Sequence, residues 1–509
     1  MDTSHSMYKL TRENGAFIVF DAQENMLLFS DRDLFQVFSY AVSGGDLIVT
    51  DGLFHQSDGS VLTIGDDNRA AVNLFKRVNG STFAHSGDMT EIHLDDYDIE
   101  LRVIDDMVYV PLATVSDLIL PITAAFNGEA VFLMSGAPDD TIVNDDGKTL
   151  SDLYYAPSER TRSEELAEFN YAELCLLLDE GYGLQAEHNV TNGFDDYFIA
   201  SSLAPQLCST DMSVYTNAVK QLMDGYFGDQ HSGLLRVSPW SGGHVEIAGG
   251  NTSVSLTEAD SVKTRFSAAR EAAGITKDGQ ITDGYSEVGD TAFITFDRFT
   301  GSTMNYYNSE LWSHFVDYYM NDTISLVVYA QSMIHRENSP IRKVVIDLSV
   351  NIGGSLEACA FIAAWVLGAA NISLEDTITG GRFTTTYWVD TNLDGIIGYD
   401  DELGVDDLDV YCLISGVSFS CANFLAALFK EDGRVTLVGQ TSGGGSCFVR
   451  NAATADGTLI CFSDRFRMSI VSNGSFYSVD RGIEPDVYLR KCASFYDRAA
   501  LADYLDTIR

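Results

Sequence analysis

The spacing of hydrophobic and polar residues changes along the chain. Over residues 1 to about 140, β-forming residues alternate or bunch in short runs between Asp- and Gly-rich turns, as in DLIVT at 46–50. This pattern predicts a β-rich module. A polar, turn-rich stretch at 136–152 then marks a boundary. Beyond it, to about residue 235, apolar residues recur at helical spacing, as at 158–183, which predicts a mostly helical segment.

From about residue 290 the pattern alternates between strand and helix. KVVIDLSV at 343–350 is a nearly continuous apolar run, typical of a strand covered on both faces. A Gly-Gly turn and an apolar helical stretch at 357–368 follow it, and CLISG at 412–416 leads in the same way into a helix at 422–433. This succession predicts an α/β core. We therefore expect three parts, at 1–140, 141–235 and 236–509.

The amino-acid composition excludes several classes of binding partner. The 509 residues include 74 acidic and 31 basic side chains, a formal net charge of −43. Such a surface repels phosphate backbones and anionic lipid, so we expect no nucleic-acid partner. The longest apolar run, at 358–372, is short for a membrane span, and the N-terminus lacks the pattern of a signal peptide. The eight cysteines include no C-x-x-C pair, which indicates neither a zinc site nor a disulfide scaffold.

Four motifs stand at the ends of the expected core elements. Two of them can support acyl-transfer chemistry. A serine in SGVSFSCANF would lie at a helix N-terminus, where free N–H groups favour negative charge. The glycines of VIDLSVNIGG leave backbone N–H groups unshielded, although they can also serve only a tight turn. In chain order the motifs are VIDLSVNIGG at 345–354, SGVSFSCANF at 415–424, VGQTSGGGSC at 438–447 and DRGIEPDVYL at 480–489.

The order of these motifs resembles that of the C-terminal-processing (tail-specific) and tricorn-core serine proteases. The matching pieces are DLSVNIGG, SFSCAN, GRVTLVG and GIEPD. The resemblance implies an α/β (α+β) core of the ClpP/crotonase-like kind and a serine endopeptidase acting on peptides or proteins. It also implies Ser420 as the nucleophile, with Ser418 silent. The oxyanion donors would be the backbone N–H groups of Gly353 or Gly354 and of Cys421.

One departure from the family pattern concerns the general base. Better-known members use a lysine in the glycine-rich loop, and that lysine falls on Gly445 here. The resemblance to the histidine-dependent tricorn-like branch instead points, through MDGYFGDQHSGLL at 223–235, to His231 as the base. Asp480 would orient its imidazole, with Glu484 as the alternative acid. The rival histidines are His244, His314 and His335.

A second kind of site is indicated by DTNLDGIIGYDD at 390–401. Its spacing matches a calcium-binding loop of the EF-hand or dockerin type, with oxygen ligands at positions one, three, five and twelve and a glycine at six. A metal-free Asp/Gly turn is the alternative interpretation. The expected ligands of one structural Ca²⁺ are Asp390, Asn392, Asp394, the carbonyl of Ile396, and Asp401.

Two other functions remain compatible with the sequence. The chain could keep the protease fold without turnover, as a peptide-binding or adhesion module, or it could recruit a distant lysine such as Lys220 or Lys430. The stretch between His231 and the strand at 291 is short for a PDZ domain, so we expect none there. The resemblance implies a bacterial protein that is extracytoplasmic or secreted.

Overall fold

The structure of the 509-residue chain is a computed structural model. Its description covers the following residues: 7–11, 17–29, 54–55, 61–62, 75–77, 82–85, 90–104, 107–119, 123–134, 147–156, 160–243, 245, 254–301, 322–404 and 407–508.

A six-stranded sheet forms the centre of the core. Its strand order is β16-β17-β18-β21-β22-β26, and every neighbouring pair is parallel except β16 and β17. This arrangement confirms the expected α/β core. The strands are β16 Tyr285–Val288, β17 Thr291–Thr295, β18 Lys343–Asp347, β21 Asp409–Ile414, β22 Val435–Gly439 and β26 Val487–Tyr488.

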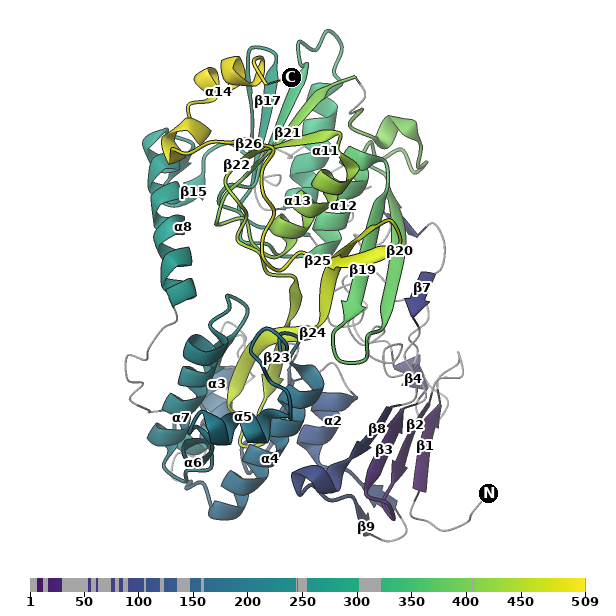
Figure 1. Ribbon diagram of the computed structural model, residues 1–509, viewed down its shortest axis with the longest axis vertical. Helices are drawn as coiled ribbons and strands as arrows, with labels where there is room; N and C mark the ends of the chain where they lie inside the picture. The colour runs from purple at the N-terminus through teal and green to yellow at the C-terminus, as the bar shows by residue number, and fades with distance from the viewer. Residues whose placement is uncertain are drawn as a thin grey trace.

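Helices cover both faces of this sheet (Figure 1). In β18, Val344 and Ile346 pack into the hydrophobic cluster of α11–α13, whereas Val345 packs into the cluster of α8, η7 and α14. Burial on both faces explains why this strand is apolar at successive positions. The helices are α11 Thr323–Ile334, α12 Leu356–Leu367 and α13 Cys421–Asp432 on one side, and α8 Val254–Ala272, η7 Cys492–Phe495 and α14 Arg498–Leu505 on the other.

A second, eight-stranded sheet joins the core to the rest of the chain. Its long strand β24 pairs with β19 in the core (Figure 1). It also pairs with β13, which begins two residues after His231. The short strands β6 and β7 come from the N-terminal 140 residues, yet they pair with β20. The strands are β6 Phe75–Arg77, β7 Thr82–His85, β13 Gly233–Arg236, β19 Ala370–Asp376, β20 Arg382–Val389, β23 Cys447–Ala453, β24 Leu459–Ser472 and β25 Ser475–Ser478.

The helical segment packs against one end of that sheet. Leu174 and Phe198 share a buried cluster with Ile460 and Phe462 of β24. Among the described residues, no helix is both long and apolar enough to cross a membrane. The helices here are α3 Leu150–Tyr154, α4 Glu164–Gly181, α5 Phe194–Ala200, α6 Ala204–Leu207, α7 Met212–Lys220 and the π-helical turn η4 Gln221–Phe227.

The N-terminal part is built from short strands. A four-stranded antiparallel sheet, β1-β2-β3-β8, packs through Leu27 and Ile92 against Leu176 of α4. Three two-stranded sheets (β4-β5, β9-β10 and β11-β12), the 3-10 helix η3 Leu94–Tyr97 and the helix α2 Leu112–Leu118 also lie in this region. The remaining strands are β1 Met7–Thr11, β2 Phe17–Asp21, β3 Met26–Phe29, β4 Phe54–His55, β5 Val61–Leu62, β8 Thr90–His93, β9 Arg102–Ile104, β10 Met107–Tyr109, β11 Thr123–Phe126 and β12 Val131–Met134.

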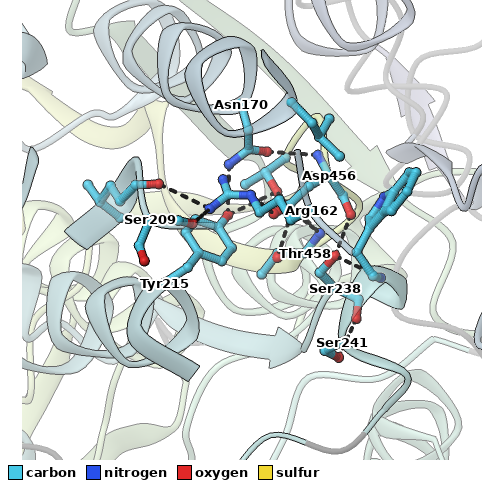
Figure 2. A network of polar contacts seen from close by, with 12 residues as sticks. Arg162, Asn170, Ser209, Tyr215, Ser238, Ser241, Asp456 and Thr458 are labelled. Atoms are coloured by element: carbon cyan, nitrogen blue, oxygen red, sulfur yellow. Dashed lines mark hydrogen bonds and ion pairs between the residues drawn. The ribbon is translucent and has the colours of Figure 1, made fainter. Parts of the chain in front are cut away.

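A buried polar network fixes the helical segment to the turn between β23 and β24 (Figure 2). Arg162 and Asp456 form an ion pair (Nε–Oδ2 3.2 Å) with both side chains fully buried. Asn170 on α4 accepts a hydrogen bond from the Asp456 N–H (2.7 Å) and donates one to the Tyr215 hydroxyl (3.0 Å). Ser238, just after β13, donates to the Asp456 carbonyl (2.6 Å). This network holds in place the helices and the strand between which the His231 turn lies.

Candidate active site

Ser420 stands at a strained turn between β21 and α13. Its backbone has φ of +56° and ψ of −123°, a conformation that residues other than glycine rarely adopt. The Ser420 N–H donates to the Gly444 carbonyl (2.9 Å), which ties the turn to the glycine-rich loop. A serine on a strained strand-to-helix turn is the geometry that exposes the nucleophile in α/β-hydrolases. Ser420 is partly exposed.

Ser418 has a structural environment. Its hydroxyl donates to the Leu348 carbonyl (2.7 Å) and accepts from the Ser415 N–H (2.9 Å), and the residue is fully buried. Through Ser418, these two hydrogen bonds connect Ser415, the residue after β21, with Leu348, the residue after β18. Of the two serines in SFS, Ser420 is therefore the one whose hydroxyl takes no part in the hydrogen bonds that stabilise the fold.

The glycines after β18 lie directly against Ser420. A Cβ atom at Gly353 would come within 2.6 Å of Ser420 Cβ and 3.1 Å of the Cys421 nitrogen, and the Gly353 φ is +96°. The Gly353 N–H is already donated to Asn351 Oδ1 (2.8 Å). The Gly354 carbonyl contacts Cys421 Sγ (3.2 Å). Within the described residues, the N–H groups of Gly354 and Cys421 have no hydrogen-bond partner.

His231 lies on the turn between η4 and β13. Its ring is 4.7 Å, centroid to centroid, from the ring of Phe419, the residue before Ser420, with 60° between the planes. Its backbone N–H donates to Asp229 Oδ1 (2.8 Å). In the described part of the chain the imidazole forms no hydrogen bond to Ser420. The fold thus brings His231 and Ser420, 189 positions apart (420 − 231), to neighbouring positions.

The environment of His231 favours its neutral form. The residue is only 7% exposed. Burial lowers the pKa of its imidazole, and the nearby carboxylates of Asp229 and Asp480 partly oppose that shift. A histidine that is neutral near pH 7 can accept a proton, which is what a general base requires.

Asp480 lies against the glycine-rich loop. Its Oδ1 accepts hydrogen bonds from the Ser446 N–H (3.0 Å) and hydroxyl (3.1 Å), and its carbonyl accepts one from the Gly445 N–H (3.1 Å). Its charge acts on His231, although no hydrogen bond joins the two side chains in the described part of the chain. Glu484 is exposed, and Asp486 accepts from the Leu437 N–H (2.8 Å).

Phe419 lies against Gly445 of the glycine-rich loop and leaves no room there for a side chain. A Cβ atom at Gly445 would come within 2.3 Å of the Phe419 ring. The same Phe419 ring contacts the ring of His231. Sequence reasoning missed Phe419, which lies inside the SFS motif, and Asp229, which lies two residues before His231 in the motif that identified it.

The rival bases lie elsewhere or have other partners. Lys220 is ion-paired with Asp224, and Lys430 with Asp486. His335 is exposed at the end of α11. His244 and His314 lie outside the described residues.

The loop at 390–401 folds around its own carboxylates. Asp390 accepts from the N–H groups of Leu393 (2.7 Å) and Gly395 (2.8 Å). Asp401 accepts from those of Thr391 (2.8 Å) and Gly398 (2.7 Å). No group of three or more His, Cys, Asp or Glu side chains in the described part of the chain is arranged to hold a metal ion. The calcium site therefore stays a prediction.

Comparison with known proteins gives a family match over the core. The sequence model of peptidase family S41 matches residues 327–489, which include the strands and turns around Ser420. No curated protein matches the chain.

Several solved structures are similar to the chain. A putative peptidase from Parabacteroides merdae has 15% identity and a TM-score of 0.44, covering 64% of this chain and 89% of its own. A lipoprotein from Streptococcus agalactiae has 14% identity and a TM-score of 0.40, covering 67% of this chain and 96% of its own. The photosystem II D1 C-terminal processing protease has 16% identity and a TM-score of 0.27, covering 41% of this chain and 47% of its own.

Proposed function

We propose that this chain, a serine peptidase whose residues 327–489 belong to peptidase family S41, is an endopeptidase with Ser420 as nucleophile and His231 as general base. The family implies peptide or protein substrates. The observation that carries the proposal is the strained Ser420 turn, with φ of +56°, packed against Gly353 and beside the His231–Phe419 ring contact. Digestion of a denatured protein, followed by mass spectrometry of the products, tests it. Internal cuts made by the wild type and missing with Ser420→Ala are expected; a lack of internal cuts by the folded wild type contradicts it.

The proposed reaction is acyl transfer in two halves. In the first, Ser420 Oγ attacks the scissile carbonyl carbon while His231 takes the hydroxyl proton, and the same imidazole then protonates the departing amine. In the second, water gives its proton to His231 and attacks the acyl-enzyme. The bond between the acyl carbon and Ser420 Oγ then breaks, His231 returns the proton to Ser420, and the new carboxyl end is released. Catalytic hydrogen bonds often tighten only in the complex with substrate, and the bond between His231 and Ser420 would form there.

The oxyanion of the tetrahedral intermediate would be held by backbone donors. The N–H groups of Gly354 and Cys421 support this role because neither has a partner within the described residues and the two residues are in contact. Gly353 supports the role of this turn as an oxyanion site in another way. Because it lacks a Cβ, the backbone at Gly353 can lie directly against Ser420. Donors fixed in advance stabilise the developing charge without reorganisation.

Replacement of Asp480 is expected to slow turnover and to move its pH dependence. In Asp480→Asn the negative charge near His231 is lost, so the pKa of His231 falls further and the acidic limb of kcat/KM moves to lower pH. The protonated imidazole also loses stabilisation, which costs up to about 10²-fold in kcat, within the range of general-base effects. A pH profile of kcat/KM checks both effects.

Glu484→Gln is the matched control for this prediction, since Glu484 is an exposed carboxylate four residues away. It is expected to leave rate and profile unchanged. Should Glu484→Gln shift the acidic limb while Asp480→Asn does not, Glu484 would be the orienting acid.

We also keep one structural Ca²⁺ at residues 390–401 as a proposal. Asp390, Asn392, Asp394, Ile396 and Asp401 would supply its oxygen ligands at calcium-loop spacing. Burial raises the pKa of Asp401, with the Asp390 charge adding to the shift, and a bound cation would relieve that repulsion. Added Ca²⁺ is therefore expected to raise the thermal unfolding temperature by mass action.

The calcium test compares wild type with Asp401→Asn in chelator and in about 1 mM Ca²⁺, the weak end of protein calcium sites. A calcium-dependent rise in Tm that Asp401→Asn removes supports the site. Equal Tm values for the wild type in both conditions would show that the loop is a metal-free turn.

A further inference from the structure

A cavity outside the Ser420 turn lies at the carboxyl ends of three parallel strands. Its volume is about 460 Å³, and its walls include Gly416 after β21, Gln440 and Thr441 after β22, and Tyr488 at the end of β26. Helix α8 closes one side with Arg265. In open parallel sheets ligands bind in crevices beyond the carboxyl ends of the strands, and this cavity occupies such a position.

The charge of the cavity is opposite to that of the protein. Its lining contains two arginines, Arg265 and Arg490, and no Asp or Glu. Neither arginine forms an ion pair or side-chain hydrogen bond within the described residues, and both are exposed. Elsewhere on this strongly acidic chain, arginines such as Arg270 and Arg336 are paired with carboxylates, namely Asp297 and Glu287. Two unpaired guanidinium groups at one cavity form a local site for an anion.

The walls of the cavity are held by backbone and amide hydrogen bonds. Gln440 Nε2 donates to the carbonyls of Leu489 (3.2 Å) and Arg490 (3.4 Å). The Gln440 N–H donates to the Ile414 carbonyl (2.9 Å), and the Leu489 N–H donates to that of Gly439 (2.8 Å). These bonds join the ends of β21, β22 and β26, so the segment carrying Arg490 is fixed before any ligand binds.

The cavity is connected to the Ser420 turn by both of its loops. Gly416 precedes Ser420 by four residues, and the loop that begins with Thr441 reaches Gly444, whose carbonyl accepts the Ser420 N–H (2.9 Å). Between them, the Gly443 N–H donates to the Ser418 carbonyl (2.8 Å). The two loops that line the cavity are therefore joined directly to the turn that carries Ser420.

We propose that this cavity is a subsite that binds a carboxylate carried by the peptide substrate, with Arg265 and Arg490 as the anion-binding pair. This proposal rests on the proposed peptidase function, because the bound peptide is a substrate only if the protein cleaves peptides. The carboxylate can come from an acidic side chain or from the C-terminus of the peptide, since a guanidinium group recognises both. The cavity thereby lets an enzyme with a net charge of −43 select acidic peptides that its overall surface would repel.

The test uses three sets of N-acetylated peptides of one neutral sequence. The first set is C-amidated with glutamate placed at each position in turn, the second is the neutral sequence with a free carboxyl end, and the third is that sequence amidated. For wild type, one carboxylate position is expected to raise kcat/KM about tenfold over the neutral amide, the effect of about 1.4 kcal/mol. In Arg265→Gln/Arg490→Gln this preference is expected to disappear.

Lys491→Gln is the matched control, because Lys491 is an exposed cation next to Arg490 that does not line the cavity. It is expected to keep the preference. Glutamate and free-carboxyl peptides distinguish the two sources of the carboxylate. The proposal is overturned if wild type shows no preference, or if the double variant keeps it, or if Lys491→Gln loses it equally.

A binding measurement distinguishes a failure of the subsite proposal from a failure of the proposed peptidase function. Fluorescence polarisation with the labelled glutamate and neutral peptides is measured on wild type and on the double variant, after circular dichroism has shown that both are folded. If wild type cuts no peptide yet binds the glutamate peptide more tightly, and the double variant does not, the peptidase proposal fails and the anion subsite stands. If the wild type cleaves all peptides at equal rates and binds them equally, the peptidase proposal stands and the subsite proposal is wrong.

Discussion

Ser420→Ala is expected to reduce peptide hydrolysis by at least about 10⁴-fold while leaving the protein folded. Without the hydroxyl there is no acyl-enzyme, and only the oxyanion donors and substrate binding remain to stabilise the transition state. The Ser420 side chain forms no hydrogen bond in the described part of the chain, so its removal leaves no buried group without a partner. Initial rates on a peptide substrate, together with the unfolding temperature, measure both parts of this result.

Ser418→Ala is the matched comparison and is expected to show the opposite pattern. Its hydroxyl joins Leu348 and Ser415 in a buried position, so the loss costs about 1–3 kcal/mol in the free energy of unfolding. The chemical machinery itself stays intact. If Ser420→Ala retains wild-type turnover, Ser420 is not the nucleophile.

His231→Gln is expected to lower kcat/KM by about 10²–10⁴-fold, the usual contribution of a general base. Glutamine is similar in size to histidine and fills the space beside Phe419, but it cannot take up a proton at neutral pH. The wild type is expected to keep activity below pH 6.5. The sign follows from burial, which lowers the pKa of His231 and so keeps the base form present at lower pH. In His231→Gln this acidic limb should vanish.

The matched control is His335→Gln, an exposed histidine at the end of α11. Its rate and pH profile are expected to equal those of the wild type. An unchanged profile for His231→Gln would contradict its role as base and would return attention to the lysines, of which Lys220 and Lys430 are the two that the sequence suggested.

The α/β core could be predicted because its sequence pattern has a local cause. The strand at 343–347 is apolar at its three central positions because both of its faces are covered, and the glycines at 353 and 354 follow it because a side chain would collide with Ser420 and Phe299. Likewise, Ser418 and Ser420 lie two residues apart in one tight turn, yet only the Ser418 hydroxyl is buried and hydrogen-bonded. Short motifs predict features of this kind, because the conformation of each turn is determined by residues within a few positions of it.

Features that depend on distant contacts could not be predicted. Nothing in the spacing of residues 75–85 indicates that β6 and β7 pair with β20, some 300 positions later. The contacts of the Phe419 ring with Gly445 and with His231 require three separate segments to meet. The cavity with Arg265 and Arg490 arises in the same way from residues that no single motif contains.

Labelling with a fluorophosphonate probe tests the central claim most directly, because the probe reacts with a serine only when that serine is activated by its surroundings. The intact wild type, Ser420→Ala, and His231→Ala are compared, each with and without Ca²⁺, and the labelled peptide is located by mass spectrometry. Labelling of the wild type on Ser420, and its loss in both variants, is the expected result. Folded wild type that takes up no label in either condition would contradict it and would support a peptide-binding protein on a protease fold.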